Sequence, residues 1–298
     1  MIIIGLVLIS PLSKSSYSQI FSFPIKSKVQ SLKSKVQSPI HSMNNKYTRI
    51  TGASKGLGRE LALELARRGY PTLLVSSTEA VHVVREEIVN KYPVDCQSFI
   101  VNLAEENEVR KWSEEIAGKY PVCILINNVG TGGSRAIETA DMDYLLRILH
   151  LNVLCTTILT KALLQNLQQN APSYILNIGS MAGFTATAYK TVYPASKSYV
   201  HAFTKSLREE LKGTGVSVTL AAPGAMATNA EVSARIAKQG FFGRATLKST
   251  PEIARKYLDG MFRKKRQIIL NPLSYLLTRV IPERWRIPLL SKIVKREL

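Results

Sequence analysis

The octapeptide Thr51-Gly52-Ala53-Ser54-Lys55-Gly56-Leu57-Gly58 decides the fold of this 298-residue chain. We expect a β-strand directly before it, at 47–50, and an amphipathic helix at its end, at 57–68. Gly52 permits a tight turn, Gly56 lets the backbone approach a bound group, and Gly58 allows close packing of helix on strand. Because N–H groups at the start of the helix would face a phosphate, the octapeptide predicts a dinucleotide-binding turn.

Strands and helices alternate along the rest of the chain. We expect strands at 72–75, 97–101, 122–126, 174–178, 216–221 and 267–270, and helices at 79–91, 105–119, 141–169, 193–212 and 251–263. Strands that alternate with helices of this length form right-handed βαβ units. The predicted fold is therefore α/β, a Rossmann-type doubly wound parallel sheet of about seven strands with helices on both faces. In such a sheet, ligands bind at the carboxyl ends of the strands.

The first strand is less apolar than a central strand of this fold should be. Arg49 lies in the middle of 47–50, and an unpaired guanidinium in a core is costly. Either its side chain reaches the rim of the sheet or finds a carboxylate, or the strand is strained, and the sequence leaves these alternatives open.

The segment after the second predicted strand indicates which dinucleotide binds. Enzymes that use NAD generally place an acidic residue here to bind the ribose 2′-OH, but this chain has Ser76 and Ser77 and no acid before Glu79. Lys55 in the glycine turn adds a positive charge on the same side. Hydroxyl groups and an ammonium suit a 2′-phosphate, so NADP is favoured over NAD. The alternative is that Lys55 is merely solvated and the site accepts either cofactor.

Two residues four apart, Tyr193 and Lys197, lie on one face of a predicted helix, and Ser180 ends the strand before it. The ordinary pKa of a tyrosine is about 10. A nearby ammonium and an oxidised nicotinamide would lower the pKa of Tyr193 toward the operating pH, which suits an acid–base group. In reduction, Tyr193 would protonate a carbonyl oxygen as hydride arrives, and Ser180 would hold that oxygen by a hydrogen bond.

The whole motif set resembles the short-chain dehydrogenase/reductase family, in order and in spacing, over about residues 46–270. The motifs are Thr51-Gly-x-x-x-Gly-x-Gly58, Asn127-Asn-Val-Gly130, Asn152, Ser180, Tyr193-x-x-x-Lys197 and Pro223-Gly224 with Thr228. The resemblance implies an NADP-dependent oxidoreductase that interconverts a carbonyl and a secondary alcohol by hydride transfer. It also implies that Lys197 binds the nicotinamide ribose and lowers the pKa of Tyr193, and that Asn152 holds a water in a proton relay behind Lys197.

The expected cofactor site gathers residues from every strand end. Besides Tyr193 and Lys197, it comprises Gly52, Ser54, Lys55, Gly56, Leu57, Gly58, Ser76, Ser77, Asn102, Leu103, Asn128, Val129, Gly130, Pro223, Gly224 and Thr228. By the resemblance, Asn102 and Leu103 would contact adenine, and 223–228 would hold the carboxamide and diphosphate. The family more often has Ala than Val129, Asp than Asn102, and a second Ser where Gly179 stands.

The partner molecules follow from less specific features. The segment 225–248 is apolar with few charges, which favours a hydrophobic substrate such as a fatty, steroid-like or aromatic ketone. The resemblance also implies a homodimer or homotetramer built through helices 141–169 and 193–212. The alternative is a non-catalytic nucleotide-binding or peripheral membrane protein that retains the fold. Against it, Asn152, Ser180, Tyr193 and Lys197 are all present, whereas a degenerate homologue would lack one of them.

Composition narrows the class of protein further. No apolar run reaches the roughly 18 residues that cross a bilayer, so an integral membrane protein is not expected. Three well-separated cysteines predict a reducing compartment, and four scattered histidines predict no metal site. We expect a cytoplasmic location. The chain carries 40 Lys+Arg against 21 Asp+Glu, a net charge of +19. Because no nucleic-acid-binding motif accompanies it, solvated ends are favoured over a nucleic-acid partner.

Both ends of the chain differ from the predicted catalytic domain at 46–270. Residues 1–45 are rich in Ser and Lys, contain no acid and repeat the hexapeptide Lys-Ser-Lys-Val-Gln-Ser, which predicts a disordered or spurious extension. The same segment is similar to an organellar transit peptide, but it lacks Arg, so targeting is the weaker interpretation. Residues 271–298 form a basic amphipathic tail that either covers the cleft, contacts a partner subunit or lies on an anionic membrane surface.

Overall fold

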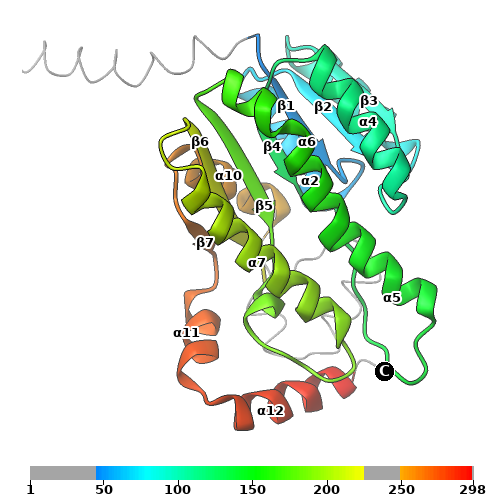
Figure 1. Cartoon of the computed structure of the whole chain (residues 1–298), viewed down its shortest axis with the longest axis vertical. Coiled ribbons are helices and arrows are strands. Elements are labelled where there is room, and N and C mark those ends of the chain that lie inside the picture. Colours follow the sequence, from blue (N-terminus) through cyan, green and yellow to red (C-terminus); the bar gives the residue numbers. More distant parts are fainter. Residues whose placement is uncertain (1–44, 225–248, 297–298) are drawn as a thin grey trace, which may run out of the picture. The chain divides into compact units, whose positions relative to one another are not determined.

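A seven-stranded parallel sheet forms the centre of the computed structural model, which describes residues 45–224 and 249–296 (Figure 1). The strands are β1 (Tyr47–Thr51), β2 (Thr72–Ser76), β3 (Cys96–Ile100), β4 (Val122–Asn127), β5 (Ser173–Ile178), β6 (Val216–Ala222) and β7 (Gln267–Ile269). Their order in the sheet is β3-β2-β1-β4-β5-β6-β7, and every neighbouring pair is parallel. The predicted doubly wound sheet is confirmed.

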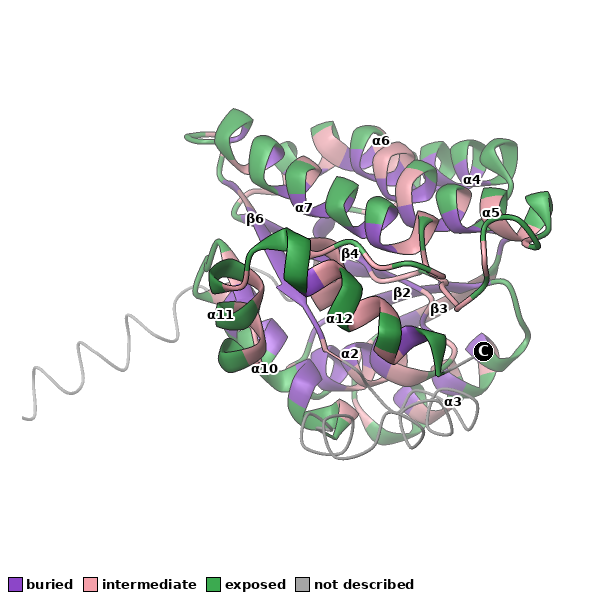
Figure 2. Ribbon diagram, turned by 90° about the horizontal axis from the view of Figure 1, so that it is seen from below, coloured by how far each residue is buried: buried purple, intermediate pink, exposed green. Residues whose placement is uncertain are grey.

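Helices cover both faces of this sheet (Figure 2). One face carries α2 (Gly56–Arg67), α3 (Ala80–Lys91) and α10 (Thr250–Phe262). The other carries α4 (Glu106–Lys119), α5 (Met142–Leu149), α6 (Cys155–Gln169) and α7 (Val192–Glu210). Strands β4 and β5 are buried at every residue, as expected of apolar runs covered on both sides. Chain order reverses between β1 and β4, so the crevice for a ligand lies at the carboxyl ends of these neighbouring strands.

The helix predicted at 141–169 is continuous but contains one irregular turn. Asp141 caps its start by accepting the Asp143 N–H at 2.8 Å. A π-helical turn, His150–Leu154, separates α5 from α6, and such turns occur frequently at functional sites. Among the described residues, Met142–Gln169 also has the length and hydropathy of a membrane span, which the sequence analysis did not anticipate. Its α6 part packs against α4 and the strands β4 and β5, and 44% of its most apolar window is buried.

Arg49 neither reaches the rim of the sheet nor finds a carboxylate. Its side chain is fully buried between the sheet and the α4–α6 layer. The guanidinium carbon lies 3.8 Å from the centroid of the Trp112 ring, and none of the three guanidinium nitrogens has a hydrogen-bond partner. Desolvation lowers the pKa of Arg49 to about 9. A cation–π contact is therefore the interaction that holds this charge in the core.

The carboxyl-terminal segment contains two helices, α11 (Pro272–Val280) and α12 (Glu283–Lys295). Asn271 caps α11 by accepting the Ser274 N–H at 3.2 Å. Figure 1 shows both helices at the bottom of the view, below α7 and α10. The expectations for the amino-terminal extension and for the segment 225–248, including Thr228, concern residues that lie outside the described ranges, apart from residue 45.

Candidate active site

The glycine turn has the backbone conformation that its residues permit. Gly52 has φ +65° and Gly56 has φ +57°, a region that favours glycine. A Cβ built on Gly58 would lie 2.2 Å from the carbonyl oxygen of Gly52 and 2.5 Å from Asn128 Nδ2. The start of α2 thus packs directly on the end of β1, and a side chain at position 58 would have to displace backbone. This tight cradle fits the dinucleotide that the sequence predicts at this turn.

Asn128 and Val129, which follow β4, lie against the same turn. The Thr51 hydroxyl accepts both of their backbone N–H groups at 2.9 Å. The Asn128 side chain donates to the carbonyl oxygens of Thr51, at 2.9 Å, and Gly52, at 3.3 Å. The structure therefore brings together the two strand ends that flank the crevice, with their predicted cofactor residues at one edge of the sheet.

The end of β2 also contacts the glycine turn. The Ser76 hydroxyl donates to the Ser54 hydroxyl at 2.8 Å, while Ser77 and Lys55 are exposed. Lys55 is the extended residue that directly precedes α2, at the amino terminus of that helix. These four residues form the side of the turn at which the sequence places the 2′-phosphate.

The residues expected near adenine are only partly brought to the site. The Asn102 side chain accepts the Ala104 N–H at 3.2 Å, and its backbone N–H donates to Glu108. Leu103 is 2% exposed and its side chain belongs to the hydrophobic core that Val109 and Trp112 of α4 also join. At the end of β6, Pro223 accepts the Met181 N–H at 2.8 Å through its carbonyl oxygen, which ties Pro223 and Gly224 to the segment after Ser180.

Lys197 and Tyr193 stand one turn apart on α7, as predicted. Lys197 is 4% exposed and its ammonium donates to the carbonyl oxygen of Ile178, two residues before Ser180, at 3.0 Å. Burial alone lowers the pKa of Lys197 to about 8. The Tyr193 ring packs on the backbone at Gly132, where a Cβ would lie 2.5 Å from the ring. Lys197 therefore reaches the carboxyl end of β5, which Ser180 follows, and the Tyr193 ring lies against the segment that follows β4.

Asn152 lies in the π-helical turn and is 1% exposed. Its side-chain oxygen accepts the Thr131 N–H, and its amide nitrogen donates to the carbonyl oxygen of Thr131 and to the Ser196 hydroxyl, each at 2.9 Å. Ser196 in turn donates to the carbonyl oxygen of Tyr193 at 2.7 Å. A Cβ on Gly130 would lie 2.8 Å from Asn152 Oδ1 and 3.1 Å from Lys197 Nζ, so Asn152 and Lys197 contact the same point of the chain.

His201 belongs to this site, although the sequence analysis did not select it. It stands one turn beyond Lys197, and its Nε2 accepts the Ser180 N–H at 3.4 Å. Added Cβ atoms would lie 2.5 Å from the imidazole at Gly179 and 2.6 Å from it at Gly183, so the ring fills a slot between two glycines. Burial and then the charges of two lysines lower the pKa of His201 to about 4. Its four-residue spacing from Lys197 is the signal that could have identified it.

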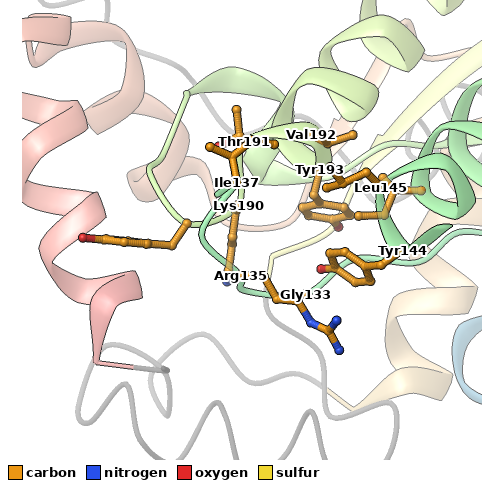
Figure 3. A pocket seen from close by; sticks show the side chains of 11 residues that line it. Gly133, Arg135, Ile137, Tyr144, Leu145, Lys190, Thr191, Val192 and Tyr193 are labelled. Carbon is orange, nitrogen blue, oxygen red and sulfur yellow. The ribbon is translucent and has the colours of Figure 1, made fainter. Parts of the chain in front are cut away.

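A pocket opens beside Tyr193 (Figure 3). Its lining is mostly apolar and includes Ile137, Leu145, Ile148 and Val192. Figure 3 shows the Tyr144 and Tyr193 rings close together on one side of it. The pocket therefore offers an apolar surface next to the phenol, where the reacting part of a substrate could lie.

The comparisons with known proteins identify the class. Residues 46–239 match the family model "short chain dehydrogenase". This chain belongs to that family, the short-chain dehydrogenases/reductases, which are NAD(P)-dependent oxidoreductases.

Among its relatives is a very-long-chain 3-oxoacyl-CoA reductase from Vanderwaltozyma polyspora. The two are 32% identical over 60% of this chain, which spans only 55% of that reductase. Among solved structures, a bulky-bulky ketone specific alcohol dehydrogenase from Comamonas testosteroni is similar, with 25% identity, TM-score 0.68, and coverage of 80% of this chain and 96% of that one. A second similar structure is described as a putative NAD(P)-dependent gluconate 5-dehydrogenase from Beutenbergia cavernae with bound NADP at low occupancy; the identity is 26%, the TM-score is 0.63, and the match covers 72% of this chain and 88% of that one.

Proposed function

We propose that this protein is an NADP-dependent oxidoreductase that interconverts a carbonyl and a secondary alcohol on a hydrophobic substrate. When bound, the dinucleotide supplies or accepts the hydride. The observation that carries the proposal is the meeting of Lys197 and Asn152 at Gly130, with the Tyr193 ring two residues further along the same segment, at Gly132. Burying an ammonium costs free energy, and buried titratable groups with shifted pKa values are concentrated at functional sites.

Each side chain has a role consistent with its contacts. Tyr193, which lines the pocket, donates a proton to the carbonyl oxygen in reduction and accepts it in oxidation. The Ser180 oxygen accepts the Ala182 N–H at 3.1 Å, so its hydroxyl proton can be directed to the substrate oxygen. Lys197 has three N–H donors, one of which bonds the Ile178 carbonyl, and its positive charge stabilises the phenolate of Tyr193. Asn152 fixes the backbone at Thr131 and, through Ser196, the turn that carries Tyr193.

Substitution of the acid–base group tests the proposal. Tyr193→Phe should lower kcat for NADPH-dependent reduction of a panel of long-chain and aromatic ketones by at least about a hundredfold, the contribution typical of general acid catalysis. NADPH affinity, measured by fluorescence titration, should change little, because the ring is retained against Gly132. Tyr199→Phe on the same helix is the matched control. Retained turnover in Tyr193→Phe would contradict the role, and wild-type protein that binds NADPH but reduces no carbonyl would favour the non-catalytic alternative.

NADP is supported by the side of the turn formed by Ser54, Lys55, Ser76 and Ser77, which contains hydroxyls and a cation but no acid. A relative of known structure binds NADP. Lys55→Ala should therefore raise the Kd of NADPH about tenfold and that of NADH little, because an ammonium beside a phosphate contributes about 1–2 kcal/mol. Lys111→Ala, on the opposite face of the sheet, serves as the control. Equal effects on both cofactors would show that the site does not distinguish them.

The substrate class and the assembly are proposed on separate observations. The apolar lining beside Tyr193, together with relatives named for very-long-chain 3-oxoacyl and bulky ketone substrates, supports a hydrophobic carbonyl compound. A homo-oligomer is supported by an exposed apolar stripe on α5, formed by Met142, Leu146 and Leu149. Light scattering of the purified chain should give at least twice the monomer mass, and a monomer at micromolar concentration would contradict the oligomer.

A further inference from the structure

The outer face of α11 is apolar and uncovered. Leu273, Leu276, Leu277 and Val280 follow the spacing i, i+3, i+4 and i+7, which places them on one face of the helix. Their exposed fractions are 66%, 55%, 44% and 67%. A soluble helix ordinarily turns such a stripe toward the core, so these four side chains form a surface that needs a partner.

Helix α12 carries two more exposed apolar side chains and several cations. Trp285 and Leu289, also one turn apart, are 62% and 55% exposed. The Arg284 guanidinium lies 4.8 Å from the Trp285 ring centroid. The exposed charged side chains of the two helices are basic apart from Glu283, and they are Arg279, Arg284, Lys292 and Lys295. Apolar side chains, a tryptophan and cations thus lie together on one helix pair.

The helix pair is fixed in place rather than a loose tail. Arg286 is 7% exposed and donates to the carbonyl oxygens of Thr278 and Ile281, to the Thr185 hydroxyl and to Glu283. This arginine locks the corner between α11 and α12. Because Thr185 follows the short helical turn Met181–Phe184, the corner is tied to the segment between Ser180 and Tyr193.

Two further contacts join the helix pair to the same segment. The Tyr275 and Phe184 rings pack edge to face, with centroids 4.9 Å apart. The Ser291 hydroxyl accepts the Ala188 N–H at 2.8 Å. The uncovered surface is therefore held at a set position beside the catalytic segment.

We propose that α11 and α12 form a docking surface for an anionic lipid bilayer. Residues Leu273, Leu276, Leu277, Val280, Trp285 and Leu289 enter the interface, and the neighbouring cations contact lipid headgroups. Charge decides between this occupant and a second copy of the chain. Residues 261–298 carry ten basic and two acidic side chains, so two such segments repel each other, whereas an anionic headgroup layer neutralises them. A tryptophan with a polar edge is also suited to the membrane interface.

Vesicle co-sedimentation of the full chain tests the proposal. The protein should bind vesicles of phosphatidylcholine with 30% phosphatidylserine at least about tenfold more tightly than pure phosphatidylcholine, and 0.5 M NaCl should weaken the binding. The variant Leu273→Ser/Val280→Ser/Trp285→Ser should lose at least about tenfold in affinity. Val83→Ser, an equally exposed valine on α3, should bind as the wild type does. All these positions are exposed, so we expect each variant to have the melting temperature of the wild type. This measurement also shows whether a variant is folded.

A charge variant completes the design. Arg284→Gln/Lys292→Gln/Lys295→Gln should lose affinity for anionic vesicles, whereas the charge-matched control Lys91→Gln/Lys111→Gln/Lys161→Gln, on α3, α4 and α6, should not. The five lysines of 1–45 remain in every variant, so lipid binding through that segment would leave the two variants equal and overturn the proposal. Absence of vesicle binding by the wild type, or loss of a dimer in light scattering when α11 is substituted, would also overturn it, the latter in favour of self-association.

Discussion

Replacing Arg49 by methionine should stabilise the folded chain. Arg49 lies in the central strand β1 with no exposed surface and with its guanidinium nitrogens unpaired. Methionine has a similar length, no charge and a flexible thioether that can fill the same space against Trp112. The substitution therefore removes a desolvated cation while leaving most of the packing in place.

The magnitude follows from two opposing terms. Desolvation lowers the pKa of Arg49 to about 9, at least three pH units below that of an ordinary arginine, and each pH unit corresponds to roughly 1.4 kcal/mol. Burial of the charge thus costs roughly 4 kcal/mol. The cation–π contact with the Trp112 ring, at 3.8 Å, offsets about 2 kcal/mol of this cost, the value for a desolvated contact. Arg49→Met should accordingly raise the free energy of unfolding by about 2 kcal/mol, and Tm by about 4–8 °C for a domain of this size.

Urea unfolding and differential scanning calorimetry at pH 7 measure this change. The folded state binds the Arg49 proton less tightly than the unfolded state, so the penalty is complete below pH 9 and shrinks as the pH rises above it. The difference between the variant and the wild type should therefore be largest at neutral pH. Arg49→Lys keeps a charge but loses the planar contact with Trp112, so it should be no more stable than the wild type. A variant Arg49→Met that unfolds at the same or lower urea concentration would refute the reasoning.

Two predictions concern the catalytic segment. Because burial lowers the pKa of Lys197 to about 8, its positive charge is lost as the pH rises through 8, and kcat/KM for carbonyl reduction should fall above that pH; a profile flat to pH 10 would contradict this. His201→Ala should lower kcat about tenfold, because the Ser180 N–H loses its acceptor, and the double variant His201→Ala/Gly179→Ser should recover part of it by refilling the slot. An unchanged kcat in His201→Ala, or no recovery in the double variant, would show that the imidazole does not position Ser180.

Local sequence was sufficient to predict the glycine turn and the alternation of elements. A positive φ at Gly52 and Gly56 depends only on the residue at that position, because glycine adopts this conformation without steric cost. The spacing of Tyr193 and Lys197 likewise fixes their relation within one helix. Each of these features depends on a few neighbouring residues, which is why the pattern alone identified them and placed the strand ends at one edge of the sheet.

Features that depend on distant segments were not predictable in this way. The surroundings of Arg49 depend on Trp112, which reaches it from α4. The role of His201 depends on the absence of side chains at Gly179 and Gly183, on a strand end and a turn that come before it in the chain. The sequence shows that each of these residues is present. Which residue it contacts depends on how the whole domain packs, and local sequence does not reveal that.

The position of Gly130 explains how the two halves of the site become one. The cofactor half is held by Thr51, whose hydroxyl accepts the N–H groups that follow β4. The catalytic half is held by Asn152, whose amide binds the backbone at Thr131. Gly130 lies between them, with space for a Cβ taken by Asn152 Oδ1 at 2.8 Å and Lys197 Nζ at 3.1 Å. A side chain there would have to displace the Lys197 ammonium or the Asn152 amide, so the absence of one lets both groups lie against the segment that joins the two halves of the proposed site.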